Sequence, residues 1–188
     1  MFKKILVIIG LIGMIGWAIY DSASAPKKQK KVIEETQPVS NKSEVLGIEE
    51  GNKAPNFELP TLDGKKVKLS DMKGKKVILN LWATWCPPCK AEMPHMQEFY
   101  QSQKGKNVEI LAVNLTTAEK DAANIKPFVH DYGLTFPVLL DNDGLIGDTY
   151  QAFTIPTSYI IDTKGNIRKR VVGPMDKEMM TELINSIE

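Results

Sequence analysis

Two cysteines, three positions apart, come directly after a short apolar run and constrain the fold more than any other feature. Cys86 and Cys89 are the only cysteines among the 188 residues. The run before them, Val77–Trp82, is short and mostly aliphatic, which predicts a buried strand. After them, apolar residues recur at helical spacing, and Pro87 and Pro88 suit the first turn of a helix, where no backbone N–H is needed. The pattern predicts a Cys-x-x-Cys motif at a strand-to-helix junction.

This position gives the two thiols different chemistry. Unpaired backbone N–H groups and the helix dipole favour a negative charge at a helix N-terminus, so Cys86 is expected to ionise more readily than a free cysteine. The thiolate is the species that attacks a disulfide. Cys89 follows one turn later on the same face, where it can resolve a mixed disulfide. We therefore expect a redox-active Cys86–Cys89 disulfide, with Cys86 as the exposed attacking thiol and Cys89 as the shielded resolving thiol.

Three other roles for the cysteine pair remain open. A structural disulfide that closes so short a loop would stabilise the fold only slightly. A zinc site needs about four ligands, and the only histidines, His95 and His130, are not paired in sequence and are expected on helix surfaces. Two inert buried thiols are the third alternative. A Cys-x-x-Cys at this kind of junction favours redox chemistry, so neither a metal nor a separate cofactor is predicted.

The stretch resembles the active site of thioredoxin-like proteins and is most similar to the extracytoplasmic ResA/TlpA-type thiol–disulfide oxidoreductases. The residues that carry the resemblance are Trp85-Cys86-Pro87-Pro88-Cys89, Glu92, Pro94 and, far downstream, Thr154-Ile155-Pro156-Thr157. It extends from about Glu50 to the C-terminus. It implies an α/β, thioredoxin-like fold in which helices flank a central mixed sheet, with an N-terminal hairpin and a central helix–strand insertion.

Local patterns give elements that fit this fold. A hairpin is expected around the Asp63-Gly64 turn, because apolar and polar residues alternate on both sides of it. Further strands are expected at 108–114, 136–140, 157–162 and 167–172, and helices at 118–132 and 176–187. Trp82 is assigned to the core. The last helix is expected to bury one face, made of Met179, Met180, Leu183, Ile184 and Ile187.

The resemblance also implies roles for residues around the dithiol. Pro156 is expected to be a cis-proline that faces the cysteines, with an ordinary trans proline at a strand start as the alternative. A cis bond turns the preceding backbone outward, so the Ile155 N–H and C=O could pair with an extended substrate. Trp85, Pro87 and Pro88 are expected to complete the substrate-binding surface.

Glu92 is the predicted proton carrier. It follows Cys89 by three residues and therefore lies beside it on the helix. If burial raises its pKa, it can carry protons to and from Cys89, which makes it a catalytic candidate. The alternative is a surface glutamate paired with Lys90 or Lys104. Thioredoxin carries a buried aspartate six residues before its first cysteine, but that position is Asn80 here, and an amide cannot titrate.

The N-terminus predicts export and attachment to the cell membrane. Lys3 and Lys4 precede an uncharged, largely apolar run. Residues 1–20 are therefore expected to form an uncleaved single-pass anchor, with the catalytic domain on the extracytoplasmic side. A cleaved signal peptide is the alternative, since Ala23-Ser24-Ala25 resembles a cleavage site. Pro26 would then be the first mature residue, and proline fits a peptidase cleft poorly.

The rest of the chain divides into a linker and one domain. Residues 21–50 show no apolar periodicity, which predicts a flexible linker. Residues 51–188 suffice for one thioredoxin-like domain, expected to be a monomer. Residues 1–20 carry +2 and residues 21–50 carry −1 of the net +1, so the domain is neutral. A neutral domain gives no reason to expect nucleic-acid binding.

The combined prediction is a membrane-tethered thiol–disulfide oxidoreductase that reduces disulfides in partner proteins outside the cytoplasm. The resemblance implies apocytochrome c as a substrate and a membrane thiol electron donor, although other relatives reduce envelope or spore proteins. A disulfide-forming oxidase differs from a reductase only in potential. A thiol peroxidase would place a threonine three residues before its cysteine, whereas Thr84 is two before Cys86. A copper chaperone would need a Cys-x-x-x-Cys.

Overall fold

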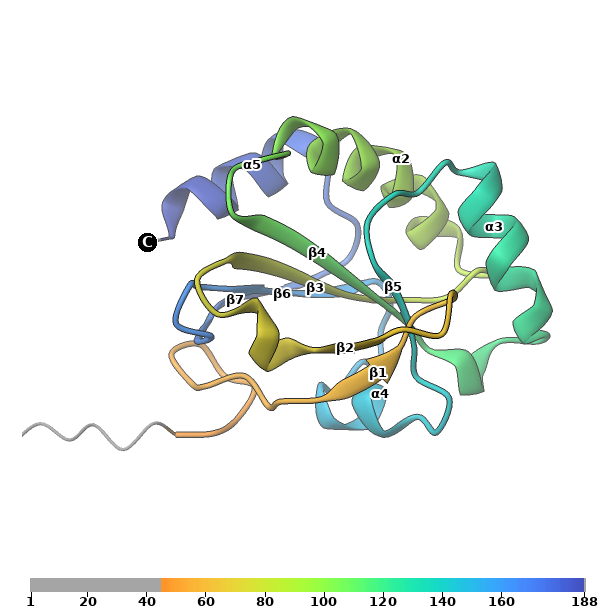
Figure 1. Cartoon of the computed structure of the whole chain (residues 1–188), viewed down its shortest axis with the longest axis horizontal. Helices are drawn as coiled ribbons and strands as arrows, with labels where there is room; N and C mark the ends of the chain where they lie inside the picture. Colours follow the sequence, from red (N-terminus) through yellow and green to blue (C-terminus); the bar gives the residue numbers. More distant parts are fainter. Residues whose placement is uncertain (1–44, 188) are drawn as a thin grey trace, which may run out of the picture. The chain divides into compact units, whose positions relative to one another are not determined.

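A computed structural model describes residues 45–187, and its centre is a five-stranded mixed sheet. The strand order is β5-β4-β3-β6-β7 (Figure 1). The strands are β3 (Lys76–Trp82), β4 (Val108–Asn114), β5 (Val138–Leu140), β6 (Thr157–Ile161) and β7 (Ile167–Val172). The helices are α2 (Pro87–Ser102), α3 (Ile125–Asp131), α4 (Leu145–Thr149) and α5 (Lys177–Ser186).

β3 is the central strand because its side chains can be buried on both faces. It pairs parallel with β4, to which α2 provides the crossover, and antiparallel with β6. All of its residues except Lys76 are buried. A strand covered on both sides needs a nearly continuous apolar sequence, which Val77–Trp82 supplies. Asn80 is the polar exception, and it lies opposite Ser158 of β6 in the register.

Alternation along β3 divides the core into two layers. Ile78 and Trp82 pack on the face covered by α2, α3 and α5. Val77, Leu79 and Leu81 pack on the opposite face, which the β1–β2 hairpin and α4 cover (Figure 1). Because successive side chains of a strand point to opposite faces, Asn80 shares the face of Ile78 and Trp82 and is directed toward α2.

The sequence prediction of the fold class is confirmed. The N-terminal hairpin consists of β1 (Glu58–Pro60) and β2 (Lys66–Lys68), paired antiparallel around the Asp63-Gly64 turn. α3 and β5 form the central helix–strand insertion, and β6 and β7 form the antiparallel pair at the other side of the sheet. α2 runs through Pro94, and Trp82 is fully buried against Phe128 as expected.

Three details differ from the sequence prediction. The helix expected over 118–132 is broken: two short 3₁₀ turns precede α3, which begins only at Ile125. α4 was not predicted, because its five residues are too few for a periodic pattern; it begins after Gly144, whose φ of 77° suits glycine. Met179 was assigned to the buried face of the last helix, but it is 41% exposed, whereas Met180 is fully buried. Consecutive helical residues point about 100° apart, and here Met180 faces the core while Met179 is directed partly toward solvent.

The predicted anchor over residues 1–20 and most of the linker over residues 21–50 lie outside the described residues, and both stay predictions. Among residues 45–187, no helix combines the length and the apolar composition that a membrane crossing requires.

Candidate active site

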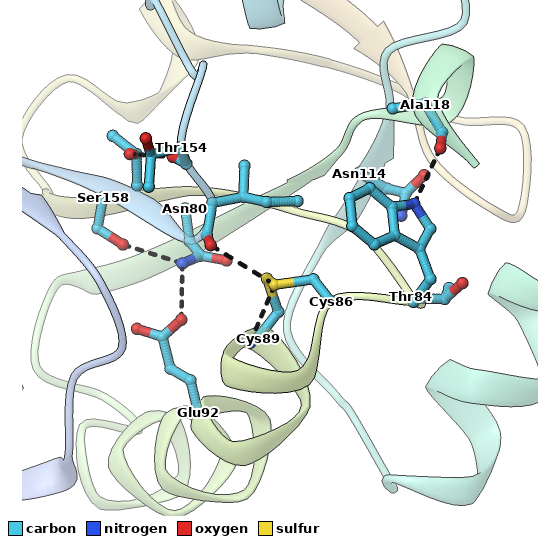
Figure 2. Close-up of a disulfide and its surroundings, with 12 residues drawn as sticks. Asn80, Thr84, Cys86, Cys89, Glu92, Asn114, Ala118, Thr154 and Ser158 are labelled. Carbon is cyan, nitrogen blue, oxygen red and sulfur yellow. Dashed lines mark hydrogen bonds between the residues drawn. A yellow bond between two sulfur atoms is a disulfide. The ribbon is translucent and has the colours of Figure 1, made fainter.

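The dithiol lies at the N-terminus of α2, at the end of the central strand. Cys86 is the N-cap residue, and its backbone is extended, with φ −78° and ψ 113°. Pro87 and Pro88 occupy the first two helical positions. The backbone N–H of Cys89 donates a hydrogen bond to Cys86 Sγ over 3.2 Å (Figure 2). Such a donor and the helix dipole both stabilise negative charge on this sulfur, as the attacking role requires.

Cys86 and Cys89 form a disulfide, with their Cα atoms 5.3 Å apart. Cys89 is fully buried, as expected for the resolving thiol. Cys86 is only 2% exposed, so the expectation of an exposed Cys86 is wrong for this oxidised form. The reason is packing: the sulfur lies against the loop before β6 rather than in solvent.

That loop contains the predicted cis-proline. The Ile155–Pro156 peptide bond is cis, and Pro156 is buried while Ile155 is half-buried. Cys86 Sγ lies 3.6 Å from the Ile155 carbonyl oxygen (Figure 2). The structure therefore brings Cys86, Ile155 and Pro156 together, although they are about seventy positions apart in sequence.

Exposed apolar residues flank both of the segments that meet at the nearly buried sulfur. Trp85, 44% exposed, precedes Cys86, and Pro87 and Pro88 follow it on the surface. Phe153 lies two residues before Ile155 and is 82% exposed, although the sequence analysis did not select it. The sequence signal that could have identified Phe153 is its position directly before Thr154-Ile155-Pro156. An exposed apolar surface of this kind is typical of a protein contact site.

Glu92 is buried and faces the sheet. Its side chain has no exposed surface. Oε1 accepts a hydrogen bond from the Met175 backbone N–H over 3.0 Å, and Oε2 accepts one from Asn80 Nδ2 over 3.1 Å. Figure 2 shows the carboxyl pointing from α2 toward Asn80. The alternative of a surface glutamate paired with Lys90 or Lys104 is therefore wrong.

The surroundings of Glu92 favour its neutral form. Burial raises the pKa of Glu92 from 4.5 to about 7, because a charged carboxylate loses its hydration in the core. The hydrogen bonds from Met175 and Asn80 lower the pKa but only partly offset the burial. A group that titrates near neutral pH can both accept and donate a proton, which is what a general acid–base group needs.

Asn80 connects Glu92 to the sheet. Its Nδ2 also donates to Ser158 Oγ over 2.9 Å, and both side chains are fully buried (Figure 2). Asn80 Oδ1 has no hydrogen-bond partner within the described residues. A neutral Glu92 has an O–H to donate, and a rotation of the Asn80 amide would present Oδ1 to accept it. Ser158 and Met175 were not selected from the sequence, because only the sheet register and the packing of α5 bring them here.

The comparisons with known proteins agree with this geometry. The AhpC/TSA family model matches residues 50–170. The chain belongs to the AhpC/TSA family. It is 42% identical over 188 residues to the thioredoxin-like protein YneN of Bacillus subtilis, covering 98% of this chain and 99% of that protein. It is 36% identical over 188 residues to the thiol-disulfide oxidoreductase ResA of the same organism, covering 100% of this chain and 93% of that protein.

A solved structure shows the same fold. The crystal structure of StoA from Bacillus subtilis superposes with a TM-score of 0.63 and 37% identity, covering 69% of this chain and 96% of that chain. This member of the AhpC/TSA family is thus a thioredoxin-like thiol–disulfide oxidoreductase, and its Cys86–Cys89 pair is a Cys-x-x-Cys site of the expected kind.

The reduced protein should react first at Cys86. The Cys89 N–H and the start of α2 stabilise a thiolate on Cys86, whereas Cys89 is enclosed by the core. Limiting iodoacetamide followed by peptide mass mapping is expected to place most of the label on Cys86. Preferential labelling of Cys89 would contradict this assignment of roles, and a Cys86→Ala variant controls for slow labelling of Cys89.

Replacing Glu92 with glutamine should alter how stability depends on pH. In the parent, the unfolded state loses its proton near pH 4.5 and the folded state near pH 7, so stability falls as pH rises between these values. A shift of this size corresponds to about 3 kcal/mol. Glu92→Gln cannot ionise at this position and so avoids the cost of burying a carboxylate. The unfolding free energy of the variant minus that of the oxidised parent should therefore increase by about 3 kcal/mol from about pH 4 to about pH 8.

Urea unfolding of the oxidised proteins at several pH values measures this difference. Glu182→Gln, on the exposed face of α5, is the matched control. A constant difference between Glu92→Gln and the parent across the range would show that Glu92 titrates like an ordinary surface carboxyl.

Proposed function

We propose that this protein is a reductase of protein disulfides outside the cytoplasm, held at the membrane by residues 1–20. The observation that carries the proposal is the arrangement of the dithiol. Cys86 caps α2 beside the Ile155 carbonyl, exposed apolar residues surround it, and an acid with a pKa near 7 lies one turn after Cys89. This arrangement suits exchange with an extended segment of another protein better than reaction with a small oxidant.

The exchange proceeds in two balanced steps. The Cys86 thiolate attacks one sulfur of the substrate disulfide; a mixed disulfide forms, the substrate S–S bond breaks, and the departing thiolate takes a proton. Cys89, once deprotonated, attacks the Cys86 sulfur, which forms the Cys86–Cys89 disulfide and releases the second substrate thiol. The substrate gains two electrons and two protons, and the protein becomes oxidised. A membrane thiol electron donor then reduces Cys86–Cys89 again.

Glu92 is proposed to accept the Cys89 proton in the second step. Cys89 is buried, so its proton needs a carrier within the core rather than bulk water. Glu92 follows it by one helical turn, and because burial raises its pKa to about 7, both its neutral and its ionised forms are present near pH 7, the ionised form being available to act as base. During re-reduction the same group returns the proton to Cys89.

The substrate surface is proposed to combine Trp85, Pro87, Pro88, Ile155 and Pro156. An extended substrate can place its backbone beside Ile155 while its disulfide reaches Cys86. We propose an apocytochrome c with an oxidised Cys-x-x-Cys as the substrate class, on the basis of the likeness to ResA. The alternatives are other envelope or spore proteins, or net oxidation rather than reduction.

Trapping the mixed disulfide tests the proposal. In cells that express full-length Cys89→Ala, the first step can proceed but the second cannot, so substrates should accumulate as adducts of Cys86. We expect these adducts in the membrane fraction, released by dithiothreitol, with exported proteins that carry a Cys-x-x-Cys as the trapped partners. Mass spectrometry of the released proteins identifies them.

The Cys86→Ala variant is the control, because it lacks the attacking thiol and should trap nothing. Adducts made only with cytoplasmic proteins would contradict the proposed location. A parent protein found fully oxidised in growing cells would contradict net reduction.

A further inference from the structure

Glu119 is a half-buried carboxylate that the exchange chemistry does not use, although it contacts the active-site turn. It lies after β4 and directly follows the short 3₁₀ turn Thr116–Ala118, which it caps with an extended backbone. Its Oε1 accepts hydrogen bonds from the Thr84 backbone N–H over 2.6 Å and from Asn114 Nδ2 over 2.7 Å. Its Oε2 accepts one from the Thr84 hydroxyl over 2.5 Å. One carboxylate thus holds the two chain segments that leave β3 and β4.

The same segment anchors the Trp85 side chain. Trp85 Nε1 donates a hydrogen bond to the carbonyl oxygen of Ala118, over 2.8 Å. Ala118 directly precedes Glu119, and Thr84 directly precedes Trp85. Figure 2 shows Thr84, Asn114 and Ala118 on the opposite side of Cys86 from Asn80 and Glu92. Glu119 therefore connects the residue just before Trp85 to the segment that supplies the carbonyl acceptor of the Trp85 ring.

We propose that Glu119 is a positioning residue that holds Trp85 beside Cys86 for contact with protein substrates. This deepens the proposed function, because it rests on Trp85 being part of the substrate surface. The three donors to Glu119 are neutral groups, and the two residues that carry them, Thr84 and Asn114, are buried. Buried donors that lose their acceptor are costly, so the turn should shift when the carboxylate is removed.

A glutamine at position 119 should preserve the arrangement. Its carbonyl oxygen can accept the two N–H donors, and its amide can donate to the Thr84 hydroxyl, which also accepts hydrogen bonds. In that case the hydrogen bonds of residue 119, and not its charge, position Trp85. Glu119→Gln is expected to behave nearly as the parent, and Glu119→Ala is expected not to.

The test compares a protein disulfide with a small one, because only the protein needs the Trp85 surface. Full-length parent and variants are assayed for turnover of insulin disulfides with dithiothreitol as reductant, and, pre-reduced, for reaction with dithionitrobenzoate. Glu119→Ala should raise KM for insulin about tenfold, the size expected for losing hydrogen bonds to a charged group. Its kcat and its dithionitrobenzoate rate should stay within about twofold of the parent.

Control variants separate positioning from general damage. Glu182→Ala, on the exposed face of α5, should match the parent. In a Trp85→Ala background, Glu119→Ala should add less than about twofold to KM, because both changes act through the same ring. Thr84→Val removes only the hydroxyl donor and should raise KM in the same direction by less, which tests the proposal even where Glu119→Ala fails to fold.

Three results would overturn the proposal. The first is a Glu119→Gln variant as impaired as Glu119→Ala. The second is a dithionitrobenzoate rate that falls as much as the insulin reaction, which would place the effect on the dithiol. The third is an unchanged insulin KM in Trp85→Ala, which would show that Trp85 is not part of the substrate surface. A normal dithionitrobenzoate rate in the same variant would still support the proposed function of the dithiol.

Discussion

The burial of one carboxyl group, Glu92, is the constraint on which the rest of the site depends. A carboxylate in the core is costly, and the fold satisfies it with the Met175 N–H and the Asn80 amide rather than with a positive charge. Burial outweighs these two hydrogen bonds and keeps the pKa of Glu92 near neutrality. The fold thereby keeps a titratable group beside a buried thiol that has no direct access to water.

A single helix and a single strand supply most of this arrangement. The N-terminus of α2 stabilises charge on Cys86, and the next turn places Cys89 and Glu92 on the buried face. β3 ends at the dithiol, and its alternation directs Asn80 to the same layer as α2. The cis peptide bond before Pro156 belongs to the far half of the chain, and the β3–β6 pairing brings it close. The proposed protein-contact surface is made by exposed neighbours of the buried Cys86 and Cys89 sulfurs.

The parts that follow from local periodicity were predictable. The strand-to-helix junction, the pairing of the two cysteines and the position of Glu92 on α2 follow from spacing. Strand alternation in β3 also indicates the face on which Asn80 lies. The contacts of Ser158, Met175 and Glu119 depend on sheet register and loop packing, which spacing does not encode. Cys86 is almost buried because a loop that is distant in sequence covers it. The helix predicted over 118–132 is broken, and the irregular segment in its place brings Ala118 and Glu119 to the active-site turn.

The carboxyl titration of Glu92 tests the account most directly. Carbon-13 NMR of the oxidised protein, labelled at the glutamate side-chain carboxyl carbons, follows each group against pH, and the signal missing from Glu92→Gln assigns Glu92. The account predicts a midpoint near pH 7, as burial beside Asn80 requires. A midpoint near 4.5 would contradict it, because Glu92 would then be ionised throughout the neutral range and could not serve as the proton carrier for Cys89.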